Sequence, residues 1–414
     1  MGPSERVPMA DEAVMELYAL ERQRPDLCRV RRIGRSRQGR DMEVLSVGTG
    51  RRAALVVGGA HPNEPVGYAT VRCLAQLVVE NDTLRRDWSW HFLPCTDPDG
   101  AALNSGWAGR PLTLLEQHRH FFRPALAEQP EWTFPVRWKG RVHRFGLPEN
   151  DALAGLVDEL KPALVVSLHN ADFGAPFHIV DREVPGLAEC LELNVRRHGL
   201  PGGGWTTDVE GWASLGPGVY VMPRVEELVV RDHQDVPAHG AHLAHYAARY
   251  GAVTLLPEVP LYQVRARFDA APGEVLLGVA DRLEESIALV RAVAAAAPRS
   301  PGGLFGRAFA DTVAIAEHVV RSWRQQAGQD GGLLTASAVA EAHFTRVQLA
   351  LRAAGMLARA LEEQGERHEG WKAGQLLETW AAEAENELRV VPYPLQQLVA
   401  VQAGAALAAA AVLG

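Results

Sequence analysis

Histidine and carboxylate residues follow three apolar runs of the sequence, each long enough for a buried strand. They are His61 and Glu64 after residues 53–57, His169 after residues 163–168, and Glu258 after residues 252–256. His61 and Glu64 are three residues apart, a spacing that lets two side chains at a helix start face one point. With His169 they would form the two-imidazole, one-carboxylate set that holds catalytic zinc and leaves one position open. The pattern predicts one Zn²⁺ per chain, bound by His61, Glu64 and His169.

A zinc ion held in this way indicates hydrolytic chemistry. Zinc lowers the pKa of a bound water towards about 7 and polarises a carbonyl group, and a nearby carboxylate can take the proton. The sequence contains no Gly-x-Ser-x-Gly elbow, and none of its four cysteines lies in a motif typical of a nucleophile. A hydrolase with this sequence would therefore work through a metal ion.

Alternating strands and helices are expected to position these residues. The three apolar runs lack polar alternation, which is typical of parallel strands covered on both faces. Helical periodicity is expected over 11–23, 64–80, 151–160, 238–250 and 275–297. The carboxyl ends of strands in an open α/β sheet lie along one ligand-binding edge. We therefore predict an α/β domain with a mainly parallel sheet and the histidines and carboxylates at that edge.

A second, helical region is expected after a break in the pattern. Pro298, Pro301, Gly302 and Gly303 interrupt it. Helical periodicity then continues over 308–326, 336–364, 371–388 and 395–413, with no β-rich run between. These features predict a catalytic domain over residues 1–298 and a helical bundle domain over residues 304–414. The sequence does not choose between three roles for the bundle: formation of a homo-oligomer, closure over the site as a lid, and docking of a peptide substrate.

Composition excludes several classes of function. The 414 residues include 42 Lys and Arg against 50 Asp and Glu, a net charge of −8, so nucleic acid is not an expected partner. The first residues lack the apolar core of a signal peptide, and the cysteines form no framework, which favours a cytoplasmic location with free thiols. The Ala-rich segment 395–414 is interrupted by glutamines, so we expect a buried helix there and no membrane span.

Several motifs together resemble the zinc carboxypeptidase family, the carboxypeptidase A and B type, over roughly residues 11–297. In chain order they are Ile33-Gly34-Arg35-Ser36, Gly58-Gly59-Ala60-His61-Pro62-Asn63-Glu64, Asp97-Pro98-Asp99-Gly100, Leu168-His169 and Leu256-Pro257-Glu258. The resemblance implies an α/β/α sandwich on a mixed, mostly parallel sheet. It also implies zinc ligation by His61, Glu64 and His169. Glu258 would be the general base that activates the zinc-bound water and passes the proton to the leaving amine.

The sequence departs from the family pattern around the substrate. The family usually has Asn-Pro-Asp-Gly where this chain begins with Asp97. Its Asn-Arg pair, which grips a terminal carboxylate, has no clean copy, and the nearest match pairs Arg119 with His118 in place of the Asn. Arg110 or Arg123 would stabilise the oxyanion. The family's tyrosine that closes over the substrate has three candidates, which are Tyr220, Tyr246 and Tyr262.

One further group of histidines invites a metal-binding interpretation. His239, His242 and His245 are spaced three residues apart on a predicted helix. One helical turn cannot bring all three to one centre, so we expect solvated or helix-capping histidines.

Three functions follow from these observations. The first is a zinc-dependent metallocarboxypeptidase that hydrolyses the C-terminal amide bond of a peptide or peptide-like metabolite. The second is zinc-dependent deacylation of an N-acyl amino acid, as in desuccinylases and aspartoacylases, which share the H-x-x-E motif and a distant His. The long interval from Glu64 to His169 and the Asp-Pro-Asp-Gly segment favour the peptidase. The third is a non-catalytic binding module, which is considered because the family's carboxylate-binding Asn-Arg pair has no clean copy in this chain.

Overall fold

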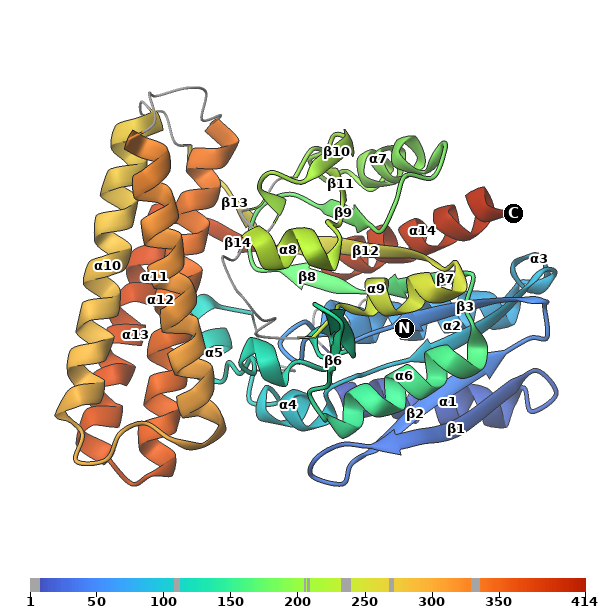
Figure 1. The fold of residues 1–414 in the computed structure, drawn as a ribbon, viewed down its shortest axis with the longest axis horizontal. Helices are drawn as coiled ribbons and strands as arrows, with labels where there is room; N and C mark the ends of the chain where they lie inside the picture. Colours follow the sequence, from blue (N-terminus) through green and yellow to red (C-terminus); the bar gives the residue numbers. More distant parts are fainter. Residues whose placement is uncertain are drawn as a thin grey trace.

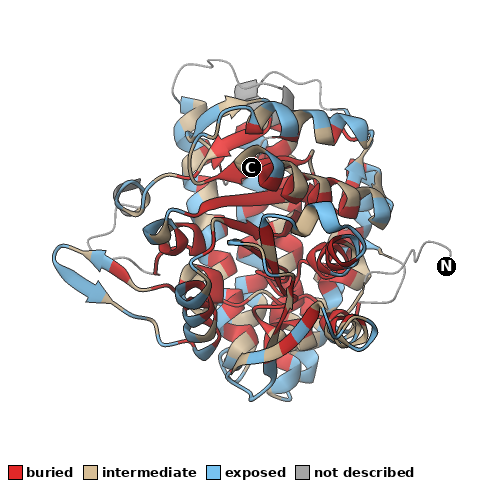
Figure 2. Ribbon diagram, turned by 90° about the vertical axis from the view of Figure 1, so that its right-hand side faces the viewer, coloured by how far each residue is buried: buried red, intermediate tan, exposed pale blue. Residues whose placement is uncertain are grey.

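The computed structural model describes residues 8–107, 112–204, 206, 209–231, 240–267, 272–328 and 336–414. A large mixed sheet with helices on both faces stands beside a bundle of long helices (Figure 1). Buried residues are concentrated in the strands and in the helix faces that contact them (Figure 2). The predicted α/β/α sandwich on a mixed, mostly parallel sheet, followed by a helical region, is confirmed.

Ten strands of the described chain form the large sheet, in the order β1-β2-β4-β3-β7-β12-β9-β11-β10, with β8 paired to β12. Its strands are β1 (Cys28–Arg35), β2 (Asp41–Val47), β3 (Arg52–Val57), β4 (Trp88–Leu93), β7 (Leu164–Ser167), β8 (His169–Ala171), β9 (Phe177–Val180), β10 (Ala213–Gly216), β11 (Val219–Val221) and β12 (Val253–Pro260). Strands β4, β3, β7 and β12 are parallel, whereas β1, β2 and β9 enter antiparallel pairs. The three apolar runs of the sequence thus form adjacent central strands.

Two helical layers cover this sheet. One face packs against α1 (Ala10–Gln23), α2 (Val66–Glu80), α7 (Leu187–Arg197) and α14 (Leu395–Leu413), and the other against α6 (Pro148–Leu160) and α9 (Leu243–Ala247). The shorter elements near the sheet are α3 (Asp82–Arg85), α4 (Pro98–Leu103), α5 (Leu114–Arg119), α8 (Val225–Arg231), 3-10 turns at Leu126–Glu128, Pro130–Trp132 and Ala248–Tyr250, and the hairpin β5 (Val136–Trp138) and β6 (Arg141–His143). Because both faces are covered, the central strands need no polar alternation.

The bundle consists of α10 (Pro272–Ala296), α11 (Gly303–Gly328), α12 (Ala336–Glu363) and α13 (Arg367–Leu388) (Figure 1). Its apolar core is continuous with residues of the sheet region such as Phe121, Phe173 and Val259. A two-stranded ladder of β13 (Tyr262–Val264) and β14 (Val390–Pro392) adds a second connection. The bundle and the sheet therefore share one core at their junction.

Two helices pack on the other side of the predicted boundary between residues 298 and 304 from the one their place in the sequence suggests. Helix α10 packs with α11 and α12, so it lies in the bundle, whereas α14 returns to the sheet and packs on α2, α7 and β12. Periodicity reveals an apolar helix face but not the element that covers it, which explains the difference. The division of the chain into two folding units stays a prediction.

Helix α14 is the one described helix whose length and composition would let it cross a membrane. Half of that span is buried in the structure. Three of its alanines, Ala405, Ala406 and Ala409, are fully buried in the core beneath the sheet. The small side chains let the helix lie close to β12 and α2.

Candidate metal centre

His61 and Glu64 lie in the turn between β3 and α2. The chain turns there through Gly59, whose φ of 52° is a left-handed conformation that favours glycine. A Cβ on Gly59 would lie 2.5 Å from the ring of Tyr68, so a side chain is also excluded by space. Both His61 and Glu64 are buried, at 4% and 3% exposure. The glycine-rich turn therefore directs two metal-ligand side chains inward at the carboxyl end of a central strand.

His169 and Glu258 reach the same place from neighbouring strands. His169 begins β8 and is paired in register with Glu258 of β12. His169 Nδ1 lies 3.0 Å from Glu64 Oε2 and 3.8 Å from Glu258 Oε1. Donor atoms of His61, Glu64 and His169 all lie within 4.8 Å of one another. The structure thus brings together all four residues that the strand ends predicted.

The three residues fit a zinc ion in type, number and burial. Donors around a tetrahedral zinc lie about 3.3 Å apart, and in this set the His169–Glu64 pair is at 3.0 Å and no pair is more than 4.8 Å apart. His61 Nδ1 is buried and has no hydrogen-bond partner among the described residues. Burial, helped by the nearby Arg123 guanidinium, lowers the pKa of His61 well below its ordinary value. His61 is therefore a neutral imidazole, the form that binds metals.

A second buried carboxylate, Glu131, holds the outer side of the histidines. Glu131 Oε2 lies 3.0 Å from His169 Nε2, and Oε1 lies 3.3 Å from His242 Nε2. Burial opposes the charge on His169, but Glu131 and Glu64 outweigh it and raise the pKa of His169 well above its ordinary value. A carboxylate behind a ligating histidine fixes the ring and strengthens its basicity. Zinc would therefore have to displace the proton that His169 holds between the two carboxylates. Glu131 lies in the short 3-10 turn Pro130–Trp132 and carries no motif, so no sequence signal pointed to it.

A hydrogen bond from α14 holds the backbone of His169. Gln402 Nε2 donates to the carbonyl oxygen of His169 at 2.6 Å, and Thr70 Oγ1 donates to Gln402 Oε1 at 2.6 Å. Both side chains are fully buried. The helix that covers the sheet therefore also positions a residue of the donor set.

The histidines of residues 239–245 have different contacts and do not meet at one centre in the described part of the chain. His242 caps α9, because its Nδ1 accepts a hydrogen bond from the backbone N–H of Ala244. His245 Nε2 lies 2.9 Å from the carbonyl oxygen of Pro223. The capping role expected of these histidines is found for His242, whose other nitrogen faces Glu131. His239 lies outside the described residues.

The donor set opens into a cavity of about 390 Å³ between the sheet and the bundle. Glu258, Arg123, Asp172, Trp132, Phe173 and Arg352 are among the residues that line it. Its size is near the lower end of the range for small-molecule sites. The site is therefore a cavity with one wall of bundle helices.

Residues 14–119 match the family model described as zinc carboxypeptidase. The resemblance predicted from the motifs is thereby confirmed. The matched segment includes His61 and Glu64 and ends before His169 and Glu258. A search of curated protein sequences found no match.

The solved structures that the chain matches include two carboxypeptidases and a putative metallopeptidase. The carboxypeptidase A from Helicoverpa armigera is 17% identical, with 78% of this chain and 74% of that chain covered and a TM-score of 0.43. A metallo-carboxypeptidase from Burkholderia cenocepacia is 16% identical, with 60% of each chain covered and a TM-score of 0.38. A putative metallopeptidase from Shewanella baltica is 15% identical, with 60% of this chain and 84% of that chain covered and a TM-score of 0.39.

The arginines around the site differ from those the zinc carboxypeptidase resemblance implied. Arg119 is directed away from the cavity and pairs with Glu116 and Glu378 on the surface. Arg110 lies outside the described residues. Arg123 is at the site, with a guanidinium nitrogen 3.1 Å from Glu64 Oε1. The structure therefore does not bring Arg119 to the donor set, whereas it does bring Arg123.

A further arginine, Arg352, comes from α12 of the bundle. Its guanidinium lies 3.1 Å from Asp172 Oδ2 and lines the cavity. A single arginine in a long helix gives no sequence signal for such a contact, because the contact depends on how the bundle docks. No arginine of the bundle was therefore among the sequence candidates.

None of the three candidate tyrosines is among the residues that line the cavity. Their hydroxyl groups donate hydrogen bonds elsewhere, from Tyr220 to the Gly204 carbonyl, from Tyr246 to Asp158 and from Tyr262 to Gln117. The described part of the chain therefore places no tyrosine from this set over the substrate position.

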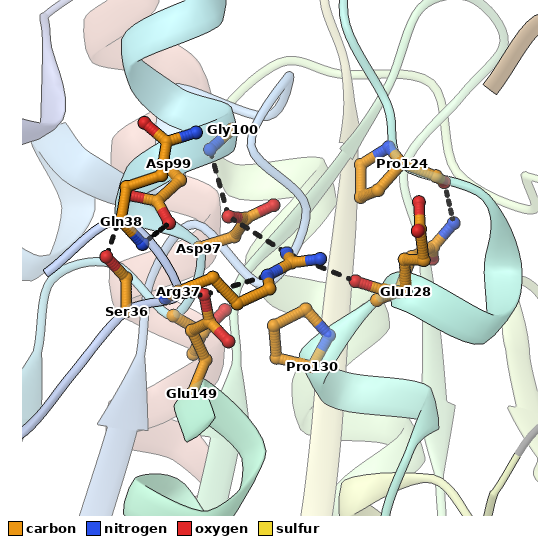
Figure 3. A network of polar contacts seen from close by, with 12 residues as sticks. Ser36, Arg37, Gln38, Asp97, Asp99, Gly100, Pro124, Glu128, Pro130 and Glu149 are labelled. Atoms are coloured by element: carbon orange, nitrogen blue, oxygen red, sulfur yellow. Dashed lines mark hydrogen bonds and ion pairs between the residues drawn. The ribbon is translucent and has the colours of Figure 1, made fainter. Parts of the chain in front are cut away.

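The Asp-Pro-Asp-Gly segment forms part of a polar network beside the site (Figure 3). Asp97 caps α4, and its Oδ1 accepts a hydrogen bond from the backbone N–H of Gly100 at 2.9 Å. Arg37 reaches Asp97 at 3.8 Å, Glu149 at 3.1 Å and the carbonyl oxygen of Glu128 at 3.5 Å. The network thus ties the β1–β2 turn and α4 to the segment that carries Arg123 and Glu131.

Proposed function

We propose that the protein is a zinc-dependent metallocarboxypeptidase that hydrolyses the C-terminal amide bond of a peptide or peptide-like metabolite. One observation carries this proposal. Donor atoms of the buried His61, Glu64 and His169 lie within 4.8 Å of one another, and Glu258 stands beside them in a cavity. The family match over residues 14–119 supports the same chemistry.

His61, Glu64 and His169 would hold the zinc ion. A bound Zn²⁺ supplies Lewis acidity towards a carbonyl oxygen and towards water. His61 is already in its ligating protonation state, because burial keeps the imidazole uncharged, and Arg123 lies 3.1 Å from the Glu64 side chain. His169 is oriented from behind by Glu131.

Glu258 would move the proton. Its side chain is 16% exposed, more open than the 3% of His169 or the 4% of Glu64, and it lines the cavity. As a water oxygen bonds to the carbonyl carbon, the Glu258 carboxylate accepts the water proton and then delivers it to the leaving nitrogen as the C–N bond breaks. Arg123 can donate hydrogen bonds to the carbonyl oxygen as negative charge develops on it.

The test compares Glu258→Gln with His61→Ala. Glu258→Gln should retain zinc and lose about 100- to 10,000-fold in peptide hydrolysis, because the proton acceptor is gone while the donor set is intact. His61→Ala should lose both zinc and hydrolysis. Zinc content is measured on purified protein, and a denaturant melt confirms that each variant folds. Hydrolysis unchanged in Glu258→Gln would refute the assigned role.

The size of the cavity also supports the alternative function, deacylation of an N-acyl amino acid. A site of about 390 Å³ suits an N-acyl amino acid as well as a short peptide. N-acyl amino acids and free-carboxylate peptides assayed side by side separate the two activities. Purified protein without bound metal, and with no uptake of added zinc, would favour the binding module.

A further inference from the structure

One face of α12 forms the wall of the cavity opposite the sheet. Glu341, Thr345, Gln348 and Arg352 line the cavity and follow one another at intervals of four, three and four residues. That spacing places them on one side of a helix. The wall belongs to the bundle, beyond the segment that matches the zinc carboxypeptidase model.

The Arg352 end of the wall is cationic and lies beside the donor set. Arg352 is held by Asp172 at 3.1 Å and lies 4.8 Å from the ring centre of Phe121. Its Nε is buried and finds no acceptor among the described residues. Arg123 lines the same cavity and pairs with Glu64. Two planar guanidinium groups in one cavity are suited to binding a carboxylate through paired hydrogen bonds.

The other end of the wall is anionic. Glu341 lies eleven residues before Arg352, is 9% exposed, and places Oε2 3.8 Å from where a Cβ on Gly174 would stand. It lines the main cavity and also a second cavity of about 310 Å³, as do Ala175 and Phe344. The Glu341 carboxylate is therefore at the junction of the two cavities, where it can attract a cationic group of a ligand.

We propose that the substrate is a short peptide with two free ends. Its carboxylate lies between Arg123 and Arg352, and its ammonium group lies beside Glu341. The inference rests on the proposed hydrolytic function and adds the substrate class to it. Eleven helical residues rise about 16 Å, so a chain of about five extended residues would reach from Arg352 to Glu341.

The test uses four versions of one pentapeptide, with a free or acetylated amino end and a free or amidated carboxyl end. Binding to the zinc-loaded Glu258→Gln protein is measured by calorimetry, and kcat/KM is measured on the wild type. Each blocked end should weaken binding about 10- to 100-fold, the usual effect of a lost hydrogen bond to a charged group. A nine-residue peptide with both ends free should bind more weakly than the pentapeptide.

Variants assign each end to its residue. Glu341→Gln should weaken binding of peptides with a free amino end and leave acetylated peptides unchanged. Arg352→Lys, which keeps the charge and loses the planar fork, should weaken binding of free carboxylates and leave amides unchanged. Glu362→Gln, at an exposed position of the same helix, is the matched control and should change neither.

The outcomes separate the inference from the proposed function. Equal binding of free and acetylated peptides, or an equal effect of Glu341→Gln on both, would overturn the inference even if hydrolysis is observed. Binding that depends on both ends, without hydrolysis by the zinc-loaded wild type, would support the ligand class and refute the peptidase. No binding of any of the four peptides would overturn the inference as well.

Discussion

Asp97→Asn is expected to stabilise the protein at neutral pH. The Asp97 side chain is fully buried, and its Oδ2 has no hydrogen-bond partner among the described residues. Burial raises the pKa of Asp97 from 3.8 to about 6, despite the hydrogen bond from Gly100 and the charge of Arg37. Asparagine is a neutral group of the same shape and an equally good helix cap.

The magnitude follows from the raised pKa of Asp97. Each pH unit between the folded and unfolded values corresponds to about 1.4 kcal/mol, so the ionised Asp97 costs at most about 3 kcal/mol at pH 7. The folded state binds the proton more tightly, so the stability that protonation contributes is fully present below about pH 4 and is lost as pH rises through 6. The advantage of Asn should therefore be largest at pH 7 to 8 and vanish near pH 4.

Urea unfolding of the wild type and of Asp97→Asn at pH 4, 5, 6, 7 and 8 measures this difference in the free energy of unfolding. Asp151→Asn, at an exposed position in the first turn of α6, is the control and should show little dependence on pH. A variant that is less stable at pH 7, or a difference that stays constant with pH, would show that the ion pair with Arg37 matters more than burial.

Three further substitutions test how the donor set is positioned. Glu131→Gln should weaken zinc binding about 10- to 100-fold, measured by competition with a chelator, because a carboxylate behind His169 is lost; unchanged affinity would contradict the role of Glu131. Gln402→Leu should lower the free energy of unfolding by about 1–3 kcal/mol, since the carbonyl of His169 loses its buried donor. It should also weaken zinc retention, which a purely structural effect would not do. Gly355→Ala should destabilise the protein by about 1–3 kcal/mol in urea unfolding, because its Cβ would lie 2.1 Å from the His118 carbonyl oxygen; a neutral result would mean that the bundle shifts easily against α5.

The sequence was sufficient to predict the central sheet and the donor set. Unbroken apolar runs identify strands buried on both faces, and the carboxyl ends of parallel strands meet at one edge, so His61, His169 and Glu258 could be placed together. The residues around them could not be predicted in this way. Glu131 lies in a short 3-10 turn, and Arg352 is one cation among many on a helix.

The arginines show the same limit more clearly. Arg119 has the right chemistry and a favourable place in the sequence, yet it forms surface ion pairs with Glu116 and Glu378. Arg352 reaches the cavity only because α12 docks on the sheet, a long-range contact that no local pattern encodes. Periodicity also does not reveal that α10 packs with the bundle and α14 with the sheet, because it does not identify the surface that each helix covers.

The return of α14 to the sheet has a consequence for biosynthesis. A ribosome completes every strand of the large sheet, and then all four bundle helices, before it makes the helix that covers β12 and α2. Throughout that interval an apolar surface of the nascent chain is without its cover, which is a condition that invites aggregation or chaperone binding. Completion of the donor set, including the hydrogen bond from Gln402 to His169, must therefore await emergence of α14 from the exit tunnel.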